Sequence, residues 1–151
     1  MKRINVFKCR VITEGCFPSR NNGEMFQLYS SEDKKIESGK IYVIKLGISV
    51  MIPQGFYAVV NGNRDSFRKY GFVPLNPTTT FMTRKFGNSD EWCIPVYAVK
   101  DVFLKKFTPV CGFEIRISQF ASIKNKVKWL LSGPIKLEKI EESNSEPITK
   151  S

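Results

Sequence analysis

The sequence lacks histidine altogether, and its four cysteines include no Cys-x-x-Cys pair. Without histidine, the commonest acid–base side chain and the commonest zinc and iron ligand are excluded. We therefore expect no metal and no cofactor. The cysteines are spread along the chain, which is typical of reduced thiols in a cytoplasmic protein; they are Cys9, Cys16, Cys93 and Cys111.

Long apolar runs are also missing. No stretch of 18 apolar residues occurs, so we expect no membrane-spanning segment and no membrane partner. The start MKRINVFKCR has no apolar core, and we expect no secretory signal there. The 151 residues, 42% of them apolar, suit one packed domain and exclude wholesale disorder. We expect that domain to cover residues 1–142, with a disordered polar tail at 143–151.

Acidic residues are scarce. The chain has 24 Lys and Arg against 14 Asp and Glu, a formal charge of +10. This excess predicts attraction to an anionic partner, such as nucleic acid, a nucleotide or an acidic protein surface. A solvated basic surface with no such partner is the alternative, and charge alone leaves both open.

Strand signals dominate what is present. Short β-branched and aromatic runs recur roughly every 8–12 residues, which favours an all-β sandwich or barrel. The runs are 6–12, 25–30, 41–52, 56–60, 92–101, 102–107 and 111–117. Pro53 and Gly55 mark a turn between two apolar runs, KLGISVMI and FYAVV, and we predict a hairpin there.

Residues 118–132 break this pattern. Phe120, Ile123, Val127, Leu130 and Leu131 recur at helical spacing, so the segment predicts one short basic amphipathic helix. Ser118 suits its N-cap, and Gly133-Pro134 suits its end. One interpretation is a partner-binding element; another is a helix that packs on the body and leaves a solvated lysine face. The partner-binding candidates are Lys124, Lys126, Lys128 and Trp129.

Four blocks between residues 24 and 117 are similar to the trimeric dUTPase family in order and spacing. They read FQLYSSEDKKIESGKIYVIKLG, KLGISVMIPQGFYAVV, YGFVPLNPTTTFMTRKFGNSDEWCIPVYAVKD and LKKFTPVCGFEIRI. The resemblance implies a distorted jelly roll that assembles into a homotrimer, with active sites between subunits. A degenerate copy in a small, lysine-rich chain also implies a viral or bacteriophage source, and then a location in the host cytoplasm.

The resemblance does not extend to the catalytic pattern. Gln27 stands where the family's first motif has aspartate, and Asn63 falls in its phosphate-gripping second motif. In the third motif, Met82 replaces the aspartate that activates water, and Lys85 replaces the tyrosine that packs on deoxyribose. Gly112 replaces the glutamine of the fourth motif, and the tail lacks the glycine-rich fifth. Methionine can neither accept a proton from water nor orient it, so we expect no catalytic residues here.

A one-residue slip aligns Arg64 and Ser66 with the second motif, which makes them candidates for phosphate contact. The phosphate-binding candidates are Arg64, Ser66, Arg68, Arg84 and Lys85. Three functions stay open. The first is a non-catalytic trimeric module that engages a host protein. The second is a nucleotide-binding protein or nucleotidohydrolase with a remodelled site. The third is a nucleic-acid-binding protein that stacks bases on Phe67, Tyr70 and Trp129.

Overall fold

The computed structural model describes residues 4–20, 25–62, 68–76, 78–83, 85–87 and 90–140. These residues form mostly β-structure, which confirms the all-β class. The strands are β1 (Val6–Val11), β2 (Ser19–Arg20), β3 (Phe26–Tyr29), β4 (Lys34–Ile36), β5 (Ile41–Lys45), β6 (Ile48–Val50), β7 (Phe56–Gly62), β8 (Phe72–Pro74), β9 (Thr78–Phe81), β10 (Cys93–Ala98), β11 (Val102–Leu104), β12 (Pro109–Ile117) and β13 (Lys136–Ile140). Helix α2 (Ile123–Leu131) separates the last two.

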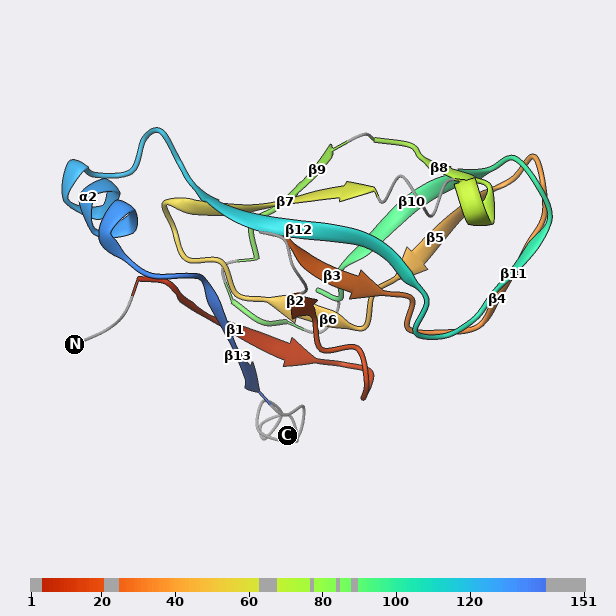
Figure 1. Ribbon diagram of the computed structural model, residues 1–151, viewed down its shortest axis with the longest axis horizontal. Coiled ribbons are helices and arrows are strands. Elements are labelled where there is room, and N and C mark those ends of the chain that lie inside the picture. The colour runs from red at the N-terminus through yellow and green to blue at the C-terminus, as the bar shows by residue number, and fades with distance from the viewer. Residues whose placement is uncertain are drawn as a thin grey trace.

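The strands form one five-stranded sheet, two three-stranded sheets and a two-stranded ribbon. Their orders are β2-β3-β12-β7-β9, β13-β1-β6, β5-β10-β8 and β11-β4. Neighbours are antiparallel except β13, which runs parallel to β1. In Figure 1 the body is elongated, with α2 at its left end and β4 and β11 at its right end. This arrangement is the distorted jelly roll expected from the sequence.

Strand β12 shows how the sequence builds the core. Its residues alternate, so Cys111, Phe113 and Ile115 are buried while Glu114 and Arg116 point outward. The buried Trp92 stacks on the Phe81 ring at 4.5 Å and meets the Phe113 ring edge-on at 5.2 Å. These inward-facing aromatic residues join the sheets into a single core.

The predicted hairpin around Pro53 is wrong. The turn itself exists: the Phe56 amide donates to the Pro53 carbonyl at 3.1 Å, and Gly55 has φ 97°. However, β6 pairs with β1, whereas β7 pairs with β12 and β9. The turn therefore carries the chain from one sheet to another, because each flanking strand finds its hydrogen-bond partners in a distant segment.

The long apolar run 41–52 is divided into β5 and β6 at Gly47. Gly47 has φ 72°, and a Cβ on it would lie 2.8 Å from the Cys16 sulfur. Only glycine tolerates both the left-handed backbone and this close approach. The break lets β5 pair with β10 while β6 pairs with β1.

The predicted helix is confirmed, but it begins later than expected. Ser122, not Ser118, is the N-cap, and its hydroxyl accepts from the Asn125 amide at 3.1 Å. Ser118 instead closes a preceding turn by accepting from the Ala121 amide at 3.0 Å. Among the residues that the structure describes, no helix has the length and apolar character needed to cross a membrane.

Candidate functional site

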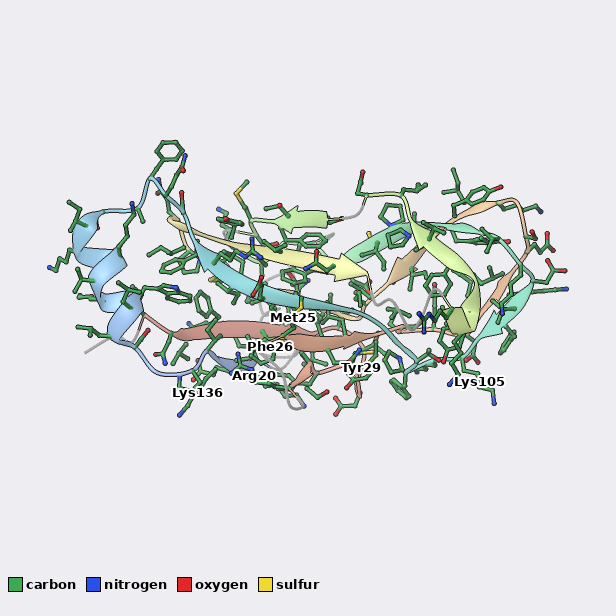
Figure 2. The ribbon with its side chains drawn as sticks, turned by 45° about the horizontal axis from the view of Figure 1, so that its top comes forward. Arg20, Met25, Phe26, Tyr29, Lys105 and Lys136 are labelled. Atoms are coloured by element: carbon green, nitrogen blue, oxygen red, sulfur yellow. The ribbon has the colours of Figure 1, made fainter. Side chains whose placement is uncertain are left out.

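Three strands bring the first- and fourth-motif positions together. Gln27 on β3 lies opposite Gly112 on β12, and Gly112 lies opposite Asn61 on β7. Met25 and Phe26, at the start of β3 (Figure 2), complete one side of a hollow of about 190 Å³. We call it the strand hollow. It is lined by Met25, Phe26, Gln27, Asn61, Gly62 and Gly112.

Glycine is needed at two positions of this lining for different reasons. A Cβ on Gly112 would lie 3.2 Å from the Phe26 carbonyl oxygen, and a Cβ on Gly62 would overlap the Pro74 ring. The Phe26 backbone and the Pro74 ring therefore occupy the space that a side chain at position 112 or 62 would need. A glutamine at position 112 would require β3 to shift.

The polar side chains that line the strand hollow are amides. Gln27 and Asn61 supply neutral donors and acceptors, and its six lining residues include neither a carboxylate nor a cation. Magnesium prefers carboxylate oxygens. Over the described parts of the chain, no group of three or more His, Cys, Asp or Glu is placed to hold a metal ion. The six lining residues can hydrogen-bond a polar group and offer no carboxylate oxygen to a metal ion.

Met82 lies in a separate place. It lines a different hollow, of about 260 Å³, beside Gln54, Tyr57 and Phe120. Tyr57 and Gly62 are five residues apart on β7, a separation of about 17 Å along a strand. Within one chain the third-motif position therefore stays away from the strand hollow. Lys85 is exposed on the segment that follows Met82.

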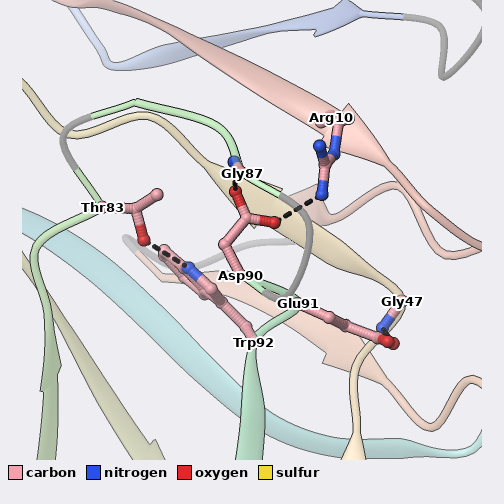
Figure 3. Close-up of polar contacts among 7 residues, drawn as sticks. All are labelled: Arg10, Gly47, Thr83, Gly87, Asp90, Glu91 and Trp92. Atoms are coloured by element: carbon pink, nitrogen blue, oxygen red, sulfur yellow. Dashed lines mark hydrogen bonds and ion pairs between the residues drawn. The ribbon is translucent and has the colours of Figure 1, made fainter. Parts of the chain in front are cut away.

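Two carboxylates near the third motif have structural partners (Figure 3). Asp90 forms an ion pair with Arg10 of β1 and accepts from the Gly87 amide at 2.7 Å. Glu91 accepts from the Gly47 amide at 2.8 Å. Both carboxylates thus fix the segment before β10 to the sheet that contains β1 and β6.

The Arg10–Asp90 pair is largely shielded from solvent. The two side chains are only 10% and 15% exposed, and the Arg10 guanidinium also lies 5.3 Å from the Phe86 ring centre. Below this pair, the Trp92 indole N–H donates to the Thr83 hydroxyl at 3.3 Å. No local pattern predicts this cluster, because Arg10 and Asp90 are 80 residues apart.

The turn before β12 has an unusual backbone conformation. Phe107 has φ 70°, which is the left-handed region. The Phe107 amide donates to the Ser30 carbonyl at 2.7 Å. Its ring covers Gly15, where a Cβ would lie only 2.8 Å from the ring. The hydrogen bond to Ser30 and the contact with Gly15 thus hold this turn against neighbouring segments.

Of the predicted phosphate-binding residues, the structure locates two. Arg68 and Lys85 are both exposed and lie on different segments. Asn63, Arg64, Ser66 and Arg84 lie outside the described residues, as does Phe67. A shared phosphate site is therefore neither supported nor contradicted.

The helix places its predicted contact residues differently from expectation. Trp129 is half-buried and packs on Phe7 and Phe56, at ring-centre distances of 6.3 and 5.1 Å. Lys124 and Lys128 are exposed, whereas Lys126 is half-buried and donates to the Gln119 carbonyl at 2.6 Å. Trp129 thus uses part of its ring for packing, and its contact with a partner or base stays a prediction. Tyr70 likewise stacks on Phe72 at 6.0 Å.

The cysteines form no disulfide and are not activated. Burial raises the pKa of the Cys9 thiol to about 12 and raises that of Cys111 further. A thiol with a raised pKa is mostly protonated near neutral pH and is a poor nucleophile. Burial therefore disfavours nucleophilic chemistry at Cys9 and Cys111.

Comparison with known proteins agrees with this architecture. No family model matches the chain. It is 27% identical over 93 residues to the SPbeta prophage-derived deoxyuridine 5'-triphosphate nucleotidohydrolase YosS of Bacillus subtilis (strain 168). That match covers 62% of this chain and 66% of the relative, slightly less than two thirds of its length.

Solved structures extend the likeness to the whole fold. The dUTPase from Streptococcus mutans superposes with a TM-score of 0.67 at 17% identity, over 76% of this chain and 98% of that chain. The dUTPase of Staphylococcus bacteriophage 80alpha gives 0.65 at 14% identity, over 79% and 86%. By sequence the chain is similar to a prophage dUTPase, and by structure it has the dUTPase-like fold.

Proposed function

We propose that this chain is a non-catalytic dUTPase-like protein that acts as a homotrimeric binding module. The observation that carries the proposal is the chemistry of the strand hollow, which pairs Gln27 with Gly112 and includes no carboxylate in its lining. The nearby Asp90 and Glu91 already bond to Arg10 and to the Gly47 amide. A metal-assisted attack of water on a triphosphate needs groups that these positions do not supply.

The test of this proposal is dUTP hydrolysis in the presence of magnesium, with the Streptococcus mutans dUTPase as the active control. Loss of a general base alone costs roughly 10²- to 10⁴-fold, so pyrophosphate release should be undetectable. Release that persists in a Met82→Ala variant would favour the second candidate, a nucleotidohydrolase with a remodelled site. Calorimetric titration with dUTP measures nucleotide binding directly. Binding without pyrophosphate release would indicate a nucleotide-binding protein that uses the Gln27 and Asn61 amides.

The proposed trimer is supported by an exposed apolar face on the β5-β10-β8 sheet, which we call the outer sheet face. Tyr97 lies opposite both Ile41 and Val73, and it is 40% exposed while Ile41 is 61% exposed. An antiparallel sheet normally presents a polar side to water. An apolar side of this extent is typical of a subunit interface. The residues of the outer sheet face are Ile41, Val43, Val73, Leu75, Pro95 and Tyr97.

The proposed partner contact lies at α2, where the lysines gather. If the chain is of phage or viral origin, the partner is a host protein and the location is the host cytoplasm. Changing Lys124, Lys126 and Lys128 to glutamate should abolish partner capture and leave the fold intact, because α2 has no buried residue. The matched control is Arg64→Ala with Lys85→Ala, which removes charge from the former catalytic region. If only the control variant loses capture, the partner binds the former site.

A further inference from the structure

The feature that the proposed function leaves unexplained is an apolar surface on α2 and the loop before it. Phe120, Ile123, Leu130 and Leu131 are 79–87% exposed, and Val127 is 48% exposed. We call these five residues the apolar stripe. Single exposed apolar residues are ordinary, but a contiguous group marks an interaction site. Of the two interpretations of this helix, the one in which the apolar residues pack on the body is contradicted for these five residues.

The stripe faces outward because Trp129 anchors the opposite side of the helix. Residues on a helix advance by about 100°, so Trp129 lies away from Ile123, Val127 and Leu130. Its ring packs on Phe7 and Phe56, which belong to β1 and β7. Packing by one large aromatic residue is enough to fix which face of α2 meets the body.

Hydrogen bonds hold the helix in this orientation. Ser122 caps its start, and the Asn5 side chain donates to the Pro134 carbonyl at 2.9 Å just after its end. The Lys136 amide in turn donates to the Asn5 carbonyl at 2.9 Å. In Figure 1, α2 stands clear at one end of the body. A prefolded, anchored helix loses little conformational entropy on binding.

Lysines flank the apolar stripe on both sides. With 100° per residue, Lys124 and Lys128 fall on one flank and Lys126 on the other. Residues 118–137 contain four lysines and no Asp or Glu. A complementary surface must therefore be apolar at its centre and negatively charged at its edges.

We propose that α2 docks as a helix into an apolar groove rimmed by Asp and Glu on a different protein, an inference that rests on the proposed binding function. Ile123, Val127 and Leu130 have the i, i+4, i+7 spacing of anchors in helix-in-groove recognition. The nine-residue helix is about 13 Å long. This length fits a short groove.

A second copy of this chain is a poorer occupant. Exposed lysines lie at or near the ends of β5 and β10 of the outer sheet face, at Lys40, Lys45 and Lys100. These charges would meet the lysines of α2 and repel them. The charge pattern therefore assigns α2 to an acidic partner and leaves the outer sheet face to assembly.

The experiment places a photo-crosslinking residue in the stripe. A Phe120→p-benzoylphenylalanine variant is irradiated in a lysate of the cells in which the chain is naturally made, and the crosslinked peptides are sequenced. Phe103→p-benzoylphenylalanine is the matched control, since Phe103 is 54% exposed at the opposite end of the body. Purified chain alone and dioleoylphosphatidylglycerol vesicles are the two comparison probes.

The expected product is a peptide of another protein that carries apolar residues flanked by Asp or Glu, obtained with Phe120 and not with Phe103. Adding Ile123→Ser and Leu130→Ser should reduce this product at least tenfold, as should raising salt from about 50 to 300 mM. The inference is overturned by a crosslink mainly to a second copy, by co-sedimentation with the vesicles, by no specific product, or by a product that the serine changes leave unaltered. None of these outcomes alters dUTP hydrolysis or sedimentation, which test the proposed function separately.

Discussion

Loss of the Asp90 carboxylate should destabilise the protein rather than inactivate an enzyme. In Asp90→Asn the side-chain oxygen can still accept from the Gly87 amide, but the Arg10 guanidinium loses its counter-charge. Arg10 is only 8% exposed, so the change removes a charged partner from a largely buried cation. Removing one partner of a buried pair costs about 3 kcal/mol, at the lower end of the range because Asp90 is 15% exposed.

The assay is thermal unfolding at a fixed protein concentration. For a chain of this size each kcal/mol lowers Tm by roughly 2–4 °C, so the expected drop is about 6–12 °C. Lys40→Gln is the matched control, because it breaks the exposed Lys40–Glu37 pair and should leave Tm within experimental error. Both variants are also assayed for dUTP hydrolysis.

Two results would refute this reasoning. A Tm for Asp90→Asn equal to that of Lys40→Gln would mean that the pair contributes nothing to stability. Loss of a measurable dUTP hydrolysis without a change in Tm would mean that Asp90 is catalytic and that the site has been rebuilt around it.

Three further outcomes are expected. Ile41→Glu with Tyr97→Glu on the outer sheet face should convert a trimer into folded monomers by sedimentation, since each exposed apolar residue becomes a charge; wild-type monomers at micromolar concentration would contradict the assembly. Gly47→Ala should cost about 2–3 kcal/mol in urea unfolding, because φ is 72° and a sulfur atom would lie 2.8 Å away; Gly39→Ala, with φ 87° but nothing within 4 Å, should cost clearly less, and equal losses would count against the packing argument. Burial raises the pKa of Cys9 from 9.0 to about 12, so the unfolded chain loses this proton at a lower pH than the folded chain does. The free energy of unfolding should therefore fall as pH rises from about 9 to 12. If Cys9→Ala shows the same pH dependence of unfolding, the thiol does not contribute.

Local pattern was enough to predict the all-β class and the position of most strands. Alternation in residues 109–117 and the β-branched run at 41–50 encode which side of each strand is apolar. The helix was also predictable from spacing, apart from its cap. Ser118 and Ser122 are the same residue type, and only the turn formed by 118–121 selects the second.

Which strands pair with each other was not predictable, because each strand's partner lies far away in the sequence. The Pro53 turn has the sequence of a hairpin, yet β6 pairs with β1 and β7 with β12. The Arg10–Asp90 ion pair likewise joins residues 80 apart, and nothing local to either residue indicates it.

The face that α2 presents was decided by tertiary packing alone. The sequence gives five apolar residues at helical spacing, and burying them is the usual outcome. Here Trp129 finds a site against Phe7 and Phe56, so it turns the helix and leaves Ile123, Leu130 and Leu131 in solvent. The sequence by itself determined that the helix is amphipathic and basic. Only the aromatic cluster from β1 and β7 decided that its apolar side faces outward, because a helix can bury just one of its faces on a body of this shape.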